Sequence, residues 1–291
     1  MCCVVVSAVA QSQDVVFVAR ALPLPMMRFH ATTREQLPDF NFRNLSQAVD
    51  IVACYQTSQL YVLDNSYDVW RIAADGINRE LLLEANRVAV SRPHRGLALA
   101  KIQPHALSVW SSRLLVTLYD EDKAKQSEGQ TVADYLIQLD AGGHELRRVN
   151  LPVEMSPTHA VESPTGTIIV SNSTYQLEES CRRHRISEVD MDGRVLRHFA
   201  GSRLLKLGSS VDIAIDSHGN VFVADDDNSH ILLLDARLTP RRIIIDKHQL
   251  NHEKKKPFFP EMPWRLCYME HTGQLLVLTD HSVAVFDVLC R

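Results

Sequence analysis

Four short runs rich in β-branched and aliphatic residues follow one another between Ser210 and Asp246. They are SSVDIAID, GNVFVAD, SHILLLD and PRRIIID, and a turn rich in Gly, Asp, Asn or Pro ends each of them. The pattern predicts four β-strands joined by tight turns. One such unit cannot bury its own apolar faces, but several copies packed around an axis can. The stretch therefore predicts one blade of a β-propeller.

An inner strand, a tight turn and a second strand recur along the whole chain. Copies start at Asp50, His105, His159, Asp212 and Arg265, at intervals of 55, 54, 53 and 53 residues, and a further copy opens the chain at Val6. The repetition predicts an all-β fold, a six-bladed propeller in one domain. The expected blades are approximately residues 2–45, 46–100, 101–155, 156–205, 206–260 and 261–291. The last copy stops after its third strand, so either this blade has three strands or the N-terminal region completes it.

The segment VADDDNSHILLLD, residues 223–235, resembles the NHL repeat. Asp225, Asn228 and Ile231 fall on the pattern of that family, and Gly219-Asn220 supplies its usual preceding turn. Other copies match more loosely. The resemblance implies a six-bladed NHL-type propeller, as at the C-terminus of TRIM-NHL proteins. The chain has no RING or B-box cysteines and no coiled-coil heptads, so it lacks the ubiquitin-ligase machinery of those proteins.

Composition excludes several classes of protein. Hydrophobic residues make up 45% of the 291 residues, enough for a large core, and the net charge of −4 gives no overall attraction to nucleic acid or anionic lipid. No run is apolar for the ~20 residues that a membrane helix needs. The six cysteines show no zinc spacing, which favours reduced thiols in a cytoplasmic protein. The start, MCCVVVSAVAQSQ, lacks the basic residues of a signal peptide and is better explained as a strand.

Three long segments interrupt the otherwise tight turns, at residues 119–131, 172–184 and 246–263. In a propeller, all three map to the face on which the inner strands begin, and this asymmetry indicates a binding face. Its aromatic and basic residues are the candidates for partner recognition, although Trp264 and one of the phenylalanines have core packing as an alternative. The candidates are Tyr175, Arg182, Arg183, Lys254, Lys255, Lys256, Phe258, Phe259 and Trp264.

The residues that begin the inner strands form a second candidate site. They are Val6, Asp50, His105, His159, Asp212 and Arg265, and five of the six are polar or ionisable. By symmetry they should ring one mouth of the central channel, where propellers commonly bind ligands. Three interpretations remain open: a solvated polar channel with Arg265 paired to an aspartate, contact with a ligand, or a metal site with His105 and His159 as ligands. The acidic run at 225–228 is expected to cap a turn, because it lacks the spacing of a calcium loop.

These features favour a non-catalytic scaffold that binds a protein partner on the face carrying the long segments. One alternative is single-stranded RNA on the same face, as in some NHL propellers, because Lys254–Lys256 lie close to aromatic residues that can stack on bases. Acidic residues in the first long segment oppose it. The other alternative is a metal-dependent lyase or lactonase-like propeller, although no hydrolase, zinc-protease or phosphate-loop motif occurs. We expect a monomer without a cofactor.

Overall fold

The computed structural model describes most of the chain. The described residues are 6–20, 25–40, 47–73, 78–84, 102–120, 134–174, 183–201, 205, 207–208, 211–246, 262–270, 272–279 and 282–288. They contain 23 strands and no helix. No described segment therefore has the length and apolar character of a membrane-spanning helix.

The strands form six antiparallel sheets, each built from consecutive strands. Blade 1 contains β1 (Val6–Ser12), β2 (Val15–Arg20), β3 (Met26–His30) and β4 (Gln36–Phe40), and blade 2 contains β5 (Ala48–Cys54), β6 (Gln59–Asp64), β7 (Val69–Ala73) and β8 (Arg79–Leu83). Blade 3 contains β9 (Ile102–Trp110), β10 (Arg113–Asp120), β11 (Tyr135–Leu139) and β12 (Glu145–Asn150), and blade 4 contains β13 (Met155–Glu162), β14 (Ile168–Thr174), β15 (Arg183–Val189) and β16 (Val195–Phe199). Blade 5 contains β17 (Val211–Ile215), β18 (Val221–Asp225), β19 (His230–Leu234) and β20 (Pro240–Ile245), and blade 6 contains β21 (Arg265–Met269), β22 (Gln274–Leu278) and β23 (Val283–Asp287).

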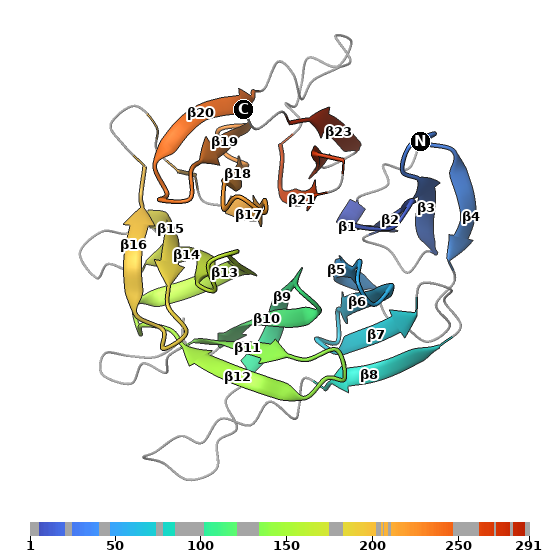
Figure 1. Cartoon of the computed structure of the whole chain (residues 1–291), viewed down its shortest axis with the longest axis horizontal. Helices are drawn as coiled ribbons and strands as arrows, with labels where there is room; N and C mark the ends of the chain where they lie inside the picture. Colours follow the sequence, from blue (N-terminus) through green and yellow to red (C-terminus); the bar gives the residue numbers. More distant parts are fainter. Residues whose placement is uncertain are drawn as a thin grey trace.

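The six sheets surround a central axis, with the first strand of each blade nearest to it (Figure 1). The predicted six-bladed β-propeller is thus confirmed. The chain start also agrees with the prediction, because Val6–Ser12 form a strand that pairs with β2. Of the two alternatives for the last blade, the described residues form the three-stranded one.

Ring closure depends on side chains, because β1 and β21 belong to different sheets and no described strand is shared between blades 1 and 6. The two blades meet in an apolar cluster that includes Val9 and Val18 of blade 1 and Leu276 and Leu278 of blade 6. Among the described residues, burial of this apolar area is what joins the two blades.

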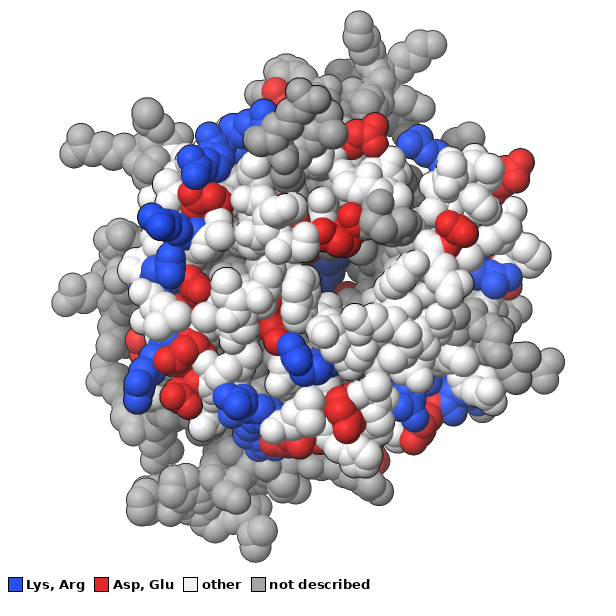
Figure 2. Space-filling view, viewed as in Figure 1, with Lys and Arg blue, Asp and Glu red and all other residues white. Residues whose placement is uncertain are grey.

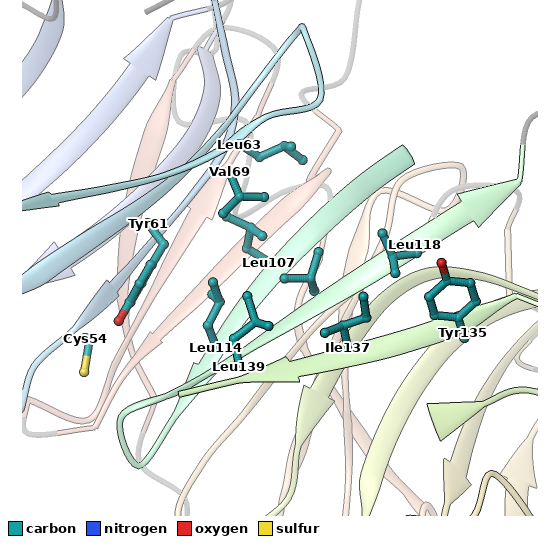
Figure 3. Packing of buried hydrophobic residues seen from close by; sticks show 11 residues of the cluster. Cys54, Tyr61, Leu63, Val69, Leu107, Leu114, Leu118, Tyr135, Ile137 and Leu139 are labelled. Carbon is teal, nitrogen blue, oxygen red and sulfur yellow. The ribbon is translucent and has the colours of Figure 1, made fainter. Parts of the chain in front are cut away.

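Most of the core lies between neighbouring blades. Tyr61 of blade 2 is completely buried in a cluster with Leu107, Leu114 and Ile137 of blade 3. Figure 3 shows side chains from the two blades meeting in this layer. Second and third strands are apolar on both sides, as in Val221–Asp225 and His230–Leu234, because each of their faces packs on a different blade. This packing explains the continuous apolar runs that the sequence shows there.

Aspartates fix many of the tight turns. Asp140, Asp190, Asp216 and Asp235 each follow a strand, and the Oδ1 atom of each accepts hydrogen bonds from the backbone N–H groups two and four residues later. The side chain thereby satisfies backbone donors that the sheet leaves free. Within the Asp216 turn, Gly219 has φ of +83°, which residues with a Cβ rarely adopt. These local signals set the five-residue turn length.

Candidate functional site

Four side chains from four blades meet at one mouth of the central channel. His159 Nδ1 lies 2.7 Å from Asp212 Oδ1, and Arg265 Nη1 donates to the same oxygen at 3.2 Å. Arg265 Nη2 lies 3.6 Å from Asp50 Oδ2. We call Asp50, His159, Asp212 and Arg265 the channel network. The pairing of Arg265 with aspartate corresponds to the first of the three interpretations that the sequence left open.

The channel network also bonds to the backbone of neighbouring blades. Asp50 of blade 2 accepts a hydrogen bond from Leu107 N of blade 3 at 2.8 Å, and Asp212 of blade 5 accepts one from Leu266 N of blade 6 at 2.7 Å. His159 Nε2 lies 3.1 Å from Leu107 O. Each of these bonds joins two inner strands that share no sheet, so the network fastens the blades to one another around the channel.

Geometry determines the protonation of His159. Its two ring nitrogens face a carboxylate oxygen and a carbonyl oxygen, and both of these atoms only accept hydrogen bonds. Only the imidazolium ion, with two N–H groups, satisfies both. Burial by itself would lower the pKa of His159, but the Asp212 carboxylate outweighs it, so the pKa is raised. The network then holds two carboxylates and two cations, and its formal charge is zero.

The raised pKa of His159 predicts a pH dependence of stability. Below the pKa of unfolded histidine, about 6.5, its contribution is fully present, and it is lost as the pH rises through the folded-state pKa. Between about pH 6 and about pH 9, wild-type protein should therefore lose more stability than His159→Gln in urea unfolding. His198→Gln removes an exposed imidazole from β16 and serves as the control. Parallel curves for wild-type protein and His159→Gln would contradict the assignment.

Strand register corrects the predicted ring at two positions. In four blades the predicted residue pairs with the same position of the second strand; these residues are Asp50, His159, Asp212 and Arg265. In blade 3 the residue that pairs with this position is Ala106, whose partner is Thr117. His105 is the extra residue of a β-bulge one position earlier.

In the opening strand the register gives Ala8, which pairs with Ala19, as the equivalent residue and not Val6. His105 is exposed and interacts electrostatically with Arg265, Asp50 and His159. Solvent reaches it, yet the surrounding protein removes enough bulk water to lower its pKa, and the nearby Arg265 lowers it further. Among the residues that the structure describes, no group of three His, Cys, Asp or Glu side chains is arranged to hold a metal ion.

Behind the channel network lies a cavity of about 530 Å³, walled by the inner strands of all six blades. Figure 2 shows the hollow at the centre of the propeller. The wall includes Val52, Val109 and Cys267, and the opposite mouth includes Tyr55, which is 64% exposed. Loss of bulk water raises the pKa of the Cys267 thiol to about 11, so it stays protonated and is a poor nucleophile at neutral pH.

The two ends of the propeller differ in the length of their connections. We call the end where the inner strands begin the insertion end, and the other the hairpin end. Every connection at the hairpin end has two to five residues between strands. All connections longer than seven residues leave from the insertion end, including those that contain 121–133, 175–182 and 247–261. Two further ones, between Leu83 and Ile102 and between Phe199 and Val211, were not singled out by the sequence.

Several predicted binding residues can be placed only in part. Seven of them lie outside the described residues: Tyr175, Arg182, Lys254, Lys255, Lys256, Phe258 and Phe259. Arg183 does not belong to a loop as predicted, because it begins β15 and pairs with Thr174. The sequence did not reveal these strand ends, because the residues on each side of this segment are polar. Asn172, for example, is buried within β14 and accepts a hydrogen bond from Ser187 Oγ at 2.8 Å. Trp264 packs on the cluster between blades 1 and 6, so its core alternative applies.

The acidic run at 225–228 caps a turn, as expected. Asp225 is fully buried, and its carboxylate accepts hydrogen bonds from Asn228 N at 3.2 Å and Asn228 Nδ2 at 2.9 Å. Asp64 holds the equivalent place in blade 2 and caps its turn through Ser66 N and Asp68 N. These carboxylates are engaged by the protein itself.

The fold therefore defines the chain as a six-bladed β-propeller whose inner strands are joined by a neutral polar network. No family model matches the chain, and no curated protein matches its sequence. Similar solved structures include hydrazine synthase of Kuenenia stuttgartiensis, at 11% identity and a TM-score of 0.64 over 97% of this chain and 83% of that chain.

Two further similar structures are complexes. A chain of a nidogen/laminin complex is 13% identical, with a TM-score of 0.58 over 85% of this chain and 82% of that chain. YCF48 bound to a D1 peptide is 11% identical, with a TM-score of 0.55 over 96% of this chain and 75% of that chain. At such low identity these similarities establish the fold alone.

Proposed function

We propose that this propeller is a non-catalytic scaffold that binds a protein partner at the insertion end. The observation that carries the proposal is the asymmetry of the connections, since every one longer than seven residues leaves from that end. A rigid repeat scaffold with short turns on one face and long loops on the other presents its variable surface on the long-loop face.

The channel network supports the non-catalytic part of the proposal. Its carboxylates and cations are paired with one another and with backbone groups of adjacent blades. Groups committed in this way stabilise the ring and offer few free ligands to a substrate.

Two comparisons support a protein as the partner. The similar nidogen/laminin and YCF48 structures are complexes with a protein or a peptide. The resemblance of residues 223–235 to the NHL repeat points the same way, because the Asp225–Asn228 turn keeps the residues of that pattern. We therefore place the chain with NHL-type propellers as part of the same proposal.

The test is the double substitution Phe258→Ala and Phe259→Ala in the 247–261 segment. We expect it to abolish binding of a partner isolated with wild-type protein and then purified, because aromatic residues dominate interface energetics. The melting temperature should stay nearly unchanged, since surface substitutions usually alter stability by no more than about 0.5 kcal/mol. Binding constants from calorimetry and a thermal melt provide the two readouts.

Leu196→Ala is the matched control, because Leu196 is exposed near the hairpin-end start of the outer strand β16. It should retain full binding. Partner binding that survives the double substitution would contradict the proposal. So would binding of single-stranded RNA that weakens steeply with salt and with replacement of Lys254–Lys256, the signature of phosphate recognition.

A further inference from the structure

Blade 6 has three strands in the part of the chain that the structure describes, one fewer than each of the other five blades. In the described residues, β23 is the edge of a three-stranded sheet, whereas β3, β7, β11, β15 and β19 each pair with a fourth strand. The side chains of Val283, Ala284, Val285 and Phe286 are all partly exposed. The corresponding β11 and β19 are completely buried. β3 and β7 are also partly exposed although each pairs with a fourth strand, so the open edge of β23, and not its exposure, distinguishes blade 6.

The edge of β23 has few of the features that protect outer strands from unwanted pairing. Outer strands carry charged residues or proline, such as Arg147 and Arg148 in β12, Arg241 and Arg242 in β20, and Pro38 in β4. The first four residues of β23 are Val-Ala-Val-Phe. β23 has one charged residue, Asp287, at its end, and a mainly apolar edge strand is a template for an added strand.

Register shows which backbone groups this edge offers. Val288 N donates to Gly273 O and Thr279 N donates to Ser282 O, both in the register in which β23 pairs with β22. In an antiparallel pair the bonded residues alternate, so Ala284 and Phe286 also bond to β22. The N–H and C=O groups of Val283, Val285 and Asp287 therefore point away from β22, toward the place of a fourth strand.

The other blades specify what such a strand must contain. In blades 1, 3, 4 and 5 the fourth strand places one large apolar residue at or next to its end, and this residue is buried. The anchors are Phe40, Val149, Phe199 and Ile245. They pair with third-strand residues Met26, Leu136, Ile186 and Ile231. Val283 holds the equivalent position in blade 6, by its pairing with Leu278.

We infer that blade 6 is a second docking site, completed in trans by an extended segment of a partner protein. The segment runs antiparallel to β23, carries polar residues along its exposed edge, and ends in a large apolar side chain that covers Val283. A second copy of this chain fits less well. Self-pairing of β23 about Val285 would place Asp287, not an apolar anchor, opposite Val283. This site lies along the edge of β23, and its test changes no residue of the 247–261 segment, so its test and that of the proposed function can fail separately.

The probe is a synthetic peptide of residues 193–201, GRVLRHFAG, which is the fourth strand of blade 4 with short flanks. Fluorescence anisotropy should show saturable binding to wild-type protein. The same peptide with Phe199→Ser should bind at least about tenfold more weakly, because burial of the anchor supplies much of the affinity. Equal binding of the two peptides would overturn the inferred anchor.

Two variants of the protein test the backbone pairing. Val285→Pro removes an N–H that points away from β22, so it should weaken peptide binding at least about tenfold while the blade stays folded. Val285→Ala loses a similar part of the side chain but keeps the N–H, and its binding should stay close to wild type. Circular dichroism checks folding, and amide shifts of Val283, Val285 and Asp287 on peptide addition to wild-type protein provide a second readout if Val285→Pro unfolds.

Three results would overturn the inference. The first is equal peptide binding by Val285→Pro and Val285→Ala, or no saturable binding to wild-type protein. The second is a wild-type dimer that Val285→Pro dissociates and Val285→Ala does not, which would assign the edge to a second copy. The third is slow hydrogen exchange at Val283, Val285 and Asp287 in the free monomer, which would show that a segment of this chain already covers the edge.

Discussion

Replacing Asp212 by asparagine is expected to lower the free energy of unfolding by about 3–5 kcal/mol, the usual cost of leaving a buried charge without its partner. Asp212 accepts three hydrogen bonds, from His159, Arg265 and Leu266 N, and it is 5% exposed. The substitution keeps the shape of the side chain but removes its negative charge. Asp50 is then the one carboxylate left in the channel network to balance the charges of His159 and Arg265. The asparagine amide cannot accept the three hydrogen bonds as strongly as a carboxylate does.

Equilibrium unfolding in guanidinium chloride measures this effect. Glu145→Gln is the control, because it removes a carboxylate that pairs with Arg148 at 2.9 Å in a partly exposed position. Exposed pairs contribute at most about 1 kcal/mol, so the control should be nearly neutral. Combining Asp212→Asn with His159→Gln should cost less than the sum of the two single changes, because the two groups interact directly. A loss below about 1 kcal/mol for Asp212→Asn would show that the network contributes little.

The repeat made the fold predictable from sequence. Runs such as GNVFVAD and SHILLLD are apolar throughout because both faces of the middle strands are covered, and the Asp and Gly residues between the runs set the turns. The outer strand of blade 1 was not recognised. β4 reads Gln-Leu-Pro-Asp-Phe, and proline argues against a strand unless it lies at an edge, which is where β4 lies.

The channel network was predictable only in part. Asp50, His159, Asp212 and Arg265 stand at equivalent positions because their spacing follows the repeat. His105 fits the same spacing to within one residue, but the register places Ala106 there, and His105 is the bulge residue that precedes it, as Val49 precedes Asp50 in blade 2. The apolar pattern of the inner strand does not show whether His105 or Ala106 pairs with Thr117. The pairing of His159 with Asp212 requires the curvature of the ring, which no local pattern encodes.

The same repeat that revealed the fold also reveals where it is incomplete. Five blades supply a fourth strand, and the sixth supplies only β21–β23 in the described residues. From sequence this left two alternatives, because a missing strand and a strand donated from elsewhere in the chain look alike. The structure adds the register of β23 and the partial exposure of Val283 and Val285. From these observations we infer that the edge of β23 binds an added strand that places a large apolar residue over Val283.

Replacing Phe222 by alanine should cost about 3–5 kcal/mol, as expected for a large aromatic side chain removed from a packed core. Phe222 lies on β18 of blade 5, is completely buried, and stacks on Tyr268 of blade 6 with ring centroids 5.0 Å apart. Its cluster also contains Leu275 and Val277 of blade 6. The cavity would therefore open between two blades, where neither sheet can close it without moving relative to the other.

Equilibrium unfolding in denaturant measures this loss, and the position of the cavity between two blades determines how the unfolding curve changes. Because each apolar cluster is shared by adjacent blades, a defect between blades 5 and 6 should lower the stability of the whole ring, and one cooperative transition should shift to lower denaturant concentration with an unchanged slope. Phe222→Leu, which keeps most of the apolar volume, should lose much less. A separate early transition confined to blades 5 and 6 would instead mean that the blades unfold as independent units, as in open repeat arrays. In that case shared packing between blades would not be what makes the ring cooperative.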